Sequence, residues 1–156
     1  MMRLLLPVLL LFLIPCGRAD DWGPLQFLVG HWTAEGGGKP GAGTGEFSFT
    51  PEVQDHVLVR RSFAQYPGSR HDDLMIIYRQ SGSLEAMFFD SENHVIHYRV
   101  AAVAGGAQFL SDGAPSETRF RLTYTAAGAN RLTLLFEIAP PGKDFARYLE
   151  ASAHRD

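Results

Sequence analysis

The side chains best suited to chemistry in this sequence are its six histidines and its clustered carboxylates. His94 and His97 are three residues apart, and in a strand this spacing places them on opposite faces, so they cannot chelate one ion locally. His71 and Asp73 lie close enough in the sequence to contribute to one site. No spacing among these residues is typical of a metal site, and we predict no metal.

Candidate nucleophiles are present without the neighbours that would activate them. Ser62, Ser83 and Ser91 lie in no nucleophile elbow and beside no recognisable pair of His and acid. The glycine-rich segment 36–45 lacks the Gly-Lys-Ser/Thr ending and the following helix of a phosphate-binding loop. The sequence therefore specifies no reaction and favours a binding protein over an enzyme.

Arg61 is the most informative single residue for binding. It shares period-two parity with Val57 and Val59, so its guanidinium either stays in water at the mouth of the fold or enters the interior and requires an acceptor. A buried guanidinium would suit a ligand carboxylate or phosphate, with the hydroxyl of Tyr78 or Tyr124 as a further donor.

Strands are needed to position these side chains, and from residue 45 onward the sequence alternates between polar and apolar residues. The expected strands are 32–35, 46–49, 57–63, 73–79, 84–89, 94–103, 107–110, 118–125, 131–138 and 145–154. Their connections are short and leave no room for crossover helices. The sequence predicts an all-β antiparallel meander of about ten strands after one short helical turn at 25–28.

A meander of this length has two edge strands to protect. The simplest solution is a single closed barrel in which the last strand pairs with the first, and a two-sheet sandwich is the structural alternative. A barrel of about ten strands is wide enough to leave an interior space that its own side chains do not fill.

The opening Gly30-His31-Trp32-Thr33-Ala34-Glu35-Gly36 resembles the Gly-x-Trp start of the calycin barrels. Its Trp-then-Gly spacing is most similar to nitrobindin and its lipocalin-like relatives. The resemblance covers most of residues 20–156 as a strand pattern, and only the opening matches as a motif. In calycins the motif Trp packs on an Arg of the closing strand, so the resemblance implies that Trp32 meets Arg155, with Arg147 as the other option. This structural contact is worth about 0.5 to 2 kcal/mol.

Nitrobindin binds haem through a His on its C-terminal strand, which directs attention to His154. If Ala151 and Ala153 face inward, strict alternation sends His154 outward, and this parity opposes ligation of an iron inside the barrel. We therefore predict no cofactor and keep a haem-binding, nitrobindin-like enzyme as an alternative.

The more apolar parity of each strand gives the candidate lining of the interior. The expected ligand-binding residues are Arg61, Tyr78, Phe88, Tyr98, Phe120, Tyr124 and Phe136. They favour a barrel that binds a small apolar or amphipathic ligand inside. The remaining alternative is a filled barrel that acts through its outer surface.

The first residues are expected to be removed. Arg3 precedes an apolar run, 4–14, that is too short to span a bilayer, and a small-x-small pattern predicts cleavage after Ala19. A lipoprotein signal with lipidated Cys16 is the alternative, and Pro15 fits it poorly. Residues 1–19 are thus predicted to be a signal peptide.

The rest of the chain, 20–156, is predicted to be one lipocalin-like barrel domain that is secreted or periplasmic and has no transmembrane span. The net charge of −3 becomes more negative without Arg3 and Arg18. An acidic surface of this kind argues against nucleic acid as a partner.

Overall fold

A computed structural model describes residues 22–156 of the chain. The predicted signal peptide, residues 1–19 with its cleavage site and Cys16, lies outside the described residues. The described chain forms one closed barrel of ten antiparallel strands, preceded by the short 3-10 helix η1 (Gly23–Leu28). This confirms the predicted closed meander over the two-sheet alternative. Within residues 22–156, no helix has the length and hydropathy needed to cross a bilayer.

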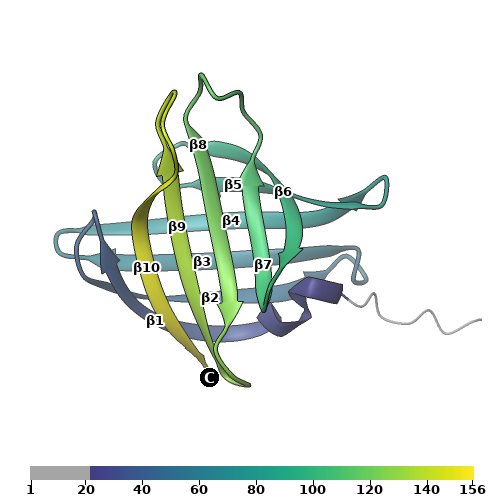
Figure 1. Cartoon of the computed structure of the whole chain (residues 1–156). Helices are drawn as coiled ribbons and strands as arrows, with labels where there is room; N and C mark the ends of the chain where they lie inside the picture. The colour runs from purple at the N-terminus through teal and green to yellow at the C-terminus, as the bar shows by residue number, and fades with distance from the viewer. Residues whose placement is uncertain (1–21) are drawn as a thin grey trace, which may run out of the picture.

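Each strand pairs with the next one along the chain, and β10 returns to pair with β1 (Figure 1). The strands are β1 (Gly30–Gly38), β2 (Gly43–Glu52), β3 (Val57–Tyr66), β4 (Ser69–Gln80), β5 (Ser83–Asp90), β6 (Val95–Val103), β7 (Gly106–Ser111), β8 (Arg119–Ala126), β9 (Arg131–Ala139) and β10 (Ala146–Arg155). Figure 1 shows β2 to β5 crossing behind β7 to β10 at a steep angle, with η1 beside the lower end of β7.

The η1 end of the barrel is closed by apolar packing around Trp32. The Trp32 side chain is 1% exposed, and its ring stacks on Phe47 with the centroids 6.2 Å apart. Its Nε1 donates a hydrogen bond of 2.8 Å to the Leu28 carbonyl at the end of η1. Leu25 and Leu28 are fully buried, so η1 acts as a plug that the Trp32 indole holds in place.

Arg155 connects the last strand to this plug. It lies opposite Trp32 in the β1–β10 register, and its guanidinium sits 4.4 Å from the centre of the indole. The same guanidinium donates hydrogen bonds to the Val29 carbonyl and, at 2.8 Å, to the Phe27 carbonyl. The other candidate, Arg147, instead pairs with Glu150 at 2.7 Å.

Gly36 lets β1 and β10 approach closely at the seam. A Cβ at this position would lie 2.3 Å from the Glu150 carbonyl oxygen and 2.6 Å from the Ala151 Cβ. Because real Cβ atoms do not come this close to backbone, the seam requires a residue without a side chain here.

Aromatic side chains fill the half of the interior next to η1. Phe49 meets Tyr124 edge to face at 5.5 Å, and Tyr124 meets Phe109 at 5.9 Å. Phe47 links these rings to Trp32, and all five side chains are at most 4% exposed. Such pairs add to the stabilisation from burial alone.

Replacing Arg155 with Ala is expected to lower the free energy of unfolding by about 2 to 4 kcal/mol, because the cation–ring contact and two charged hydrogen bonds are lost together. Urea denaturation followed by tryptophan fluorescence measures this loss. Arg147→Ala is the matched control on the same strand, since Arg147 pairs only at the surface and should cost about 0 to 1 kcal/mol. Equal losses in the two variants would contradict the role of Arg155 in closure.

Candidate functional site

The structure places five of the seven expected ligand-binding residues on the inner face of the barrel: Phe88, Tyr98, Phe120, Tyr124 and Phe136. Tyr98 and Tyr124 are at most 1% exposed. Phe88, Phe120 and Phe136 are only partly buried although they face inward. Solvent therefore reaches part of the inner face, away from the plugged end.

Arg61 and Tyr78 correct the predicted lining, because both lie on the outer face. The Arg61 side chain is 66% exposed and lies 3.8 Å from Glu52. The Tyr78 hydroxyl lies 3.4 Å from both Glu85 and His97 on neighbouring strands. The reason is that both parities of β3 and of β4 carry apolar residues, so alternation alone could not choose the inner face.

Arg60, and not Arg61, takes the inward position that was one of the two alternatives for Arg61. Its side chain is 7% exposed and forms an ion pair with Asp73, which is equally buried. The guanidinium also donates a 3.1 Å hydrogen bond to the Ser62 hydroxyl and lies 5.5 Å from the centre of the Phe47 ring. The missed signal was a pair of opposite charges on neighbouring strands, β3 and β4, because hydrophobicity alone places such residues in water.

Burial controls the protonation of this cluster. Burial alone lowers the pKa of Arg60, but the adjacent Asp73 carboxylate raises it above its ordinary value, so Arg60 stays charged. Burial raises the pKa of Asp73, and the Arg60 charge opposes that rise. Burial also raises the pKa of Tyr124 to about 12 and that of Tyr98 well above its ordinary value. Both phenols are therefore neutral hydrogen-bonding groups.

Two polar atoms of the cluster have no hydrogen-bond partner. They are the Arg60 Nε and the Tyr124 hydroxyl; the guanidinium is near enough to interact with the Tyr124 oxygen, so what this hydroxyl lacks is an acceptor for its hydrogen. Elsewhere in residues 22–156, only Trp22 Nε1 and Arg119 Nε are also buried without a partner. Because an unpaired buried polar group costs about 1 to 3 kcal/mol, this pair of atoms needs an explanation.

Asp90 adds a second carboxylate to the inner face, directly opposite Asp73 in the β4–β5 register. Its side chain is 4% exposed. Burial alone raises the pKa of Asp90, but hydrogen bonds from His94 and from the Glu92 backbone lower it below its ordinary value. The Asp90 carboxylate is therefore charged, and both of its oxygens already accept hydrogen bonds.

The end of the barrel opposite η1 is lined by aromatic rings. Phe120 and Phe136 stack with an interplanar angle of 5° and centroids 6.1 Å apart, and Tyr148 meets Phe136 edge to face. Phe120 lies near the start of β8 and Phe136 in the second half of β9. The start of β8 and the end of β9 lie at the top of Figure 1. These partly buried rings form the mouth of the interior.

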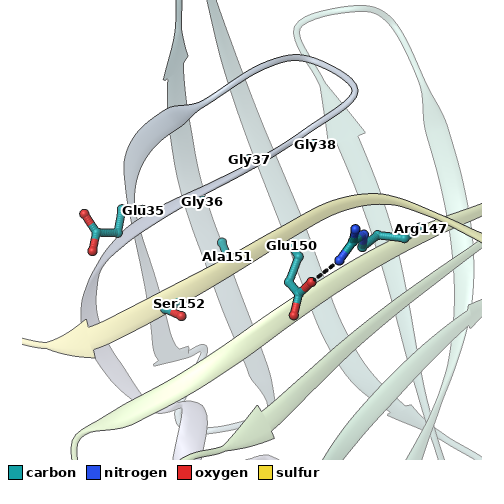
Figure 2. A pocket seen from close by; sticks show the side chains of 8 residues that line it. All are labelled: Glu35, Gly36, Gly37, Gly38, Arg147, Glu150, Ala151 and Ser152. Atoms are coloured by element: carbon teal, nitrogen blue, oxygen red, sulfur yellow. Dashed lines mark hydrogen bonds and ion pairs between the residues drawn. The ribbon is translucent and has the colours of Figure 1, made fainter.

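A shallow groove of about 360 Å³ lies outside, where β1 runs alongside β10 (Figure 2). Its charged groups are exposed, and Arg147 and Glu150 pair with each other across 2.7 Å. Glu35 and Ser152 complete its polar edge. The groove offers no buried anchor, so the interior is the better candidate site.

His154 lies on the outer face of β10, next to Thr33 and Arg131 in the register, and is exposed. Ala153 before it is buried in the core. The imidazole therefore cannot reach an iron inside the barrel, and the residues present do not fit a haem held through this histidine.

No protein-family model matches the chain, and no curated protein matches it. Several solved structures are similar to it, and two of them align with 85% of its residues at a TM-score of 0.50. One is EF1p2_mFAP2b bound to DFHBI, with 10% identity and 97% of that chain covered. The other is the S-type phycobiliprotein lyase CPES from Guillardia theta, with 8% identity and 90% covered. These similarities show a calycin-like barrel fold.

Tyr124→Phe is expected to leave the free energy of unfolding unchanged or to raise it by about 1 to 2 kcal/mol, because it removes a buried hydroxyl whose hydrogen has no acceptor. Urea denaturation of the ligand-free protein measures the change. Tyr78→Phe is the matched control, since it removes a hydroxyl that contacts Glu85 and His97. A larger loss for Tyr124→Phe than for Tyr78→Phe would show that the Tyr124 hydroxyl is satisfied.

A separate cluster on the outer face surrounds His97. Its Nε2 lies 3.0 Å from Glu85, and its Nδ1 lies 2.5 Å from Asp112, which also accepts a 2.7 Å hydrogen bond from Arg99. The hydrogen bond to Asp112, and then that to Glu85, raise the pKa of His97 above its ordinary value. The Tyr78 hydroxyl completes the cluster.

His97→Gln is expected to reduce the free energy of unfolding more at about pH 5.5 than at about pH 9. A raised folded-state pKa gives stability that is complete below the ordinary pKa of His and is lost as the pH rises through the folded value. Urea denaturation at both pH values measures the difference. The control is His56→Gln, where the imidazole contacts the Gln54 carbonyl. A loss that is equal at the two pH values would contradict the assignment.

Proposed function

We propose that this barrel binds a small apolar or amphipathic molecule in its interior, which the molecule enters at the end opposite η1. The main support comes from two buried polar atoms, Arg60 Nε and the Tyr124 hydroxyl, whose hydrogens have no acceptor and which are surrounded by aromatic side chains. Binding sites of this kind combine a mostly apolar lining with a few polar groups that fix orientation.

The open end supplies the apolar part of such a site. Phe88, Phe120 and Phe136 face inward but keep part of their surface accessible. A guest that covers these rings would remove apolar surface from water, which is the main source of affinity for small ligands of this class. The similar barrel EF1p2_mFAP2b holds DFHBI, which supports a small-molecule guest in this architecture.

We further propose that the protein works outside the cytoplasm, secreted or periplasmic, as residues 1–19 predict. Extraction of the guest from a dilute, aqueous compartment is a task that suits a barrel with one plugged end and one apolar mouth. The proposal follows from the sequence of the segment and from the lipocalin-like resemblance of its opening motif.

The test uses N-phenyl-1-naphthylamine, a neutral apolar dye whose emission rises in apolar surroundings. We expect saturable binding at one dye per chain. Phe88→Ala should weaken binding by about tenfold, because an aromatic contact in the mouth is lost. Circular dichroism of each variant shows that the barrel is still folded.

Phe89→Ala is the matched control, since the neighbouring Phe89 is 38% exposed and points outward. It should leave the affinity unchanged. Equal losses in the two variants would place the dye on the outer surface. Absence of binding to the wild-type chain would contradict the proposal and favour a filled barrel that acts through its outer face.

A further inference from the structure

We propose that the interior selects a guest with an uncharged oxygen acceptor, a carbonyl or a hydroxyl, over a guest with a carboxylate. The inference rests on the proposed function and names the chemical class of its ligand. It follows from the charges and the unpartnered donors around Arg60.

The charge of Arg60 is already balanced. Asp73 forms an ion pair with it in a region where both side chains are 7% exposed. Asp90 lies directly opposite Asp73 and is also buried, with His94 as its partner at 2.8 Å. A guest carboxylate would therefore meet one cation that already has a counter-charge and would face two nearby carboxylates. Burial of a third anion without its own partner is strongly unfavourable.

The unpartnered atoms have the polarity that a neutral oxygen needs. Arg60 Nε carries a hydrogen that only an acceptor can take, and the Tyr124 hydroxyl is free to donate as well. The two groups lie beside each other on opposite walls, β3 and β8. One carbonyl oxygen has two lone pairs and can accept from both.

The surrounding rings fix how such a guest would lie. Phe47 lies against the Arg60 guanidinium, and Phe49 and Phe109 pack around Tyr124, so little room remains beyond the polar pair toward η1. The oxygen would point inward to the pair, and the apolar remainder would extend to Phe120 and Phe136 at the mouth.

The experiment measures displacement of N-phenyl-1-naphthylamine from the full chain by three probes of equal chain length: 2-dodecanone, dodecanoate and dodecane, at a pH where dodecanoate is ionised. In the wild type, 2-dodecanone should bind about tenfold more tightly than dodecanoate, because only the ketone pairs the free donors without adding charge. It should also bind more tightly than dodecane.

Two variants separate the two parts of the inference. Tyr124→Phe should weaken binding of 2-dodecanone by about three- to tenfold and leave dodecane unchanged, since one donor is lost. Tyr78→Phe, on the outer face, is its control and should change neither. Asp73→Asn removes the counter-charge of Arg60 and should shift the preference toward dodecanoate by about tenfold or more.

Several results would overturn the inference. Dodecanoate that binds the wild type as tightly as 2-dodecanone would show that the Arg60 charge is available. A ketone no better than dodecane would show that water alone satisfies the free donors. In both cases the dye still binds, so the proposed function stands. If neither the dye nor the ketone binds the wild type, both proposals fail. Should Asp73→Asn not fold, the Tyr124→Phe comparison decides.

Discussion

The contact of Arg155 with Trp32 and the carbonyls of Phe27 and Val29 is the interaction on which the rest of the barrel depends. It joins the final strand, the first strand and the plug η1 at one point. It reinforces the β1–β10 pairing, which runs from Trp32↔Arg155 to Gly38↔Leu149 and leaves neither strand as an exposed edge. The closed ring of strands excludes water from the interior, and this exclusion makes the charges of Arg60 and Asp73 interact strongly.

Burial of the Arg60–Asp73 ion pair inside the barrel carries a large desolvation cost. Two ions taken out of water lose hydration that their mutual attraction repays only when the remaining hydrogen-bonding groups are satisfied, and well-packed apolar side chains are often as stable in such a place. Here the remaining groups are not all satisfied, because Arg60 Nε and the Tyr124 hydroxyl have no partner. If the ion pair served only to stabilise the fold, hydrogen bonds to these two atoms would make the fold more stable. The unsatisfied atoms therefore support the proposed function, in which the polar groups are preorganised for a guest.

The sequence predicted the parts of the fold that local patterns determine. Strand alternation and tight turns gave the ten-strand meander, and the inward parity of β5, β6, β8 and β9 placed Phe88, Tyr98, Tyr124 and Phe136 on the inner face. It failed in β3 and β4, where apolar residues occupy both parities, because the face that Arg61 shares with Val57 and Val59 is the outer face. Arg60 is the buried arginine because the β3–β4 register brings it next to Asp73. The pattern of a single strand does not contain the register between two strands.

The two ends of the barrel have different physical tasks, and the position of the polar pair follows from both. The η1 end must exclude water, so it is packed with rings that contact one another and with a helix that covers them. The rings of the other end remain partly exposed, as the proposed entry of a guest there requires. A charged pair at the mouth would be hydrated and would discriminate poorly, while one under the plug would be out of reach. Tyr124 belongs to the packed rings of the η1 end, and the Arg60 guanidinium borders them 5.5 Å from the centre of Phe47. Under the proposed function, a guest that enters from the mouth would meet this polar pair where water is scarce, and selectivity for its polar group would be greatest there.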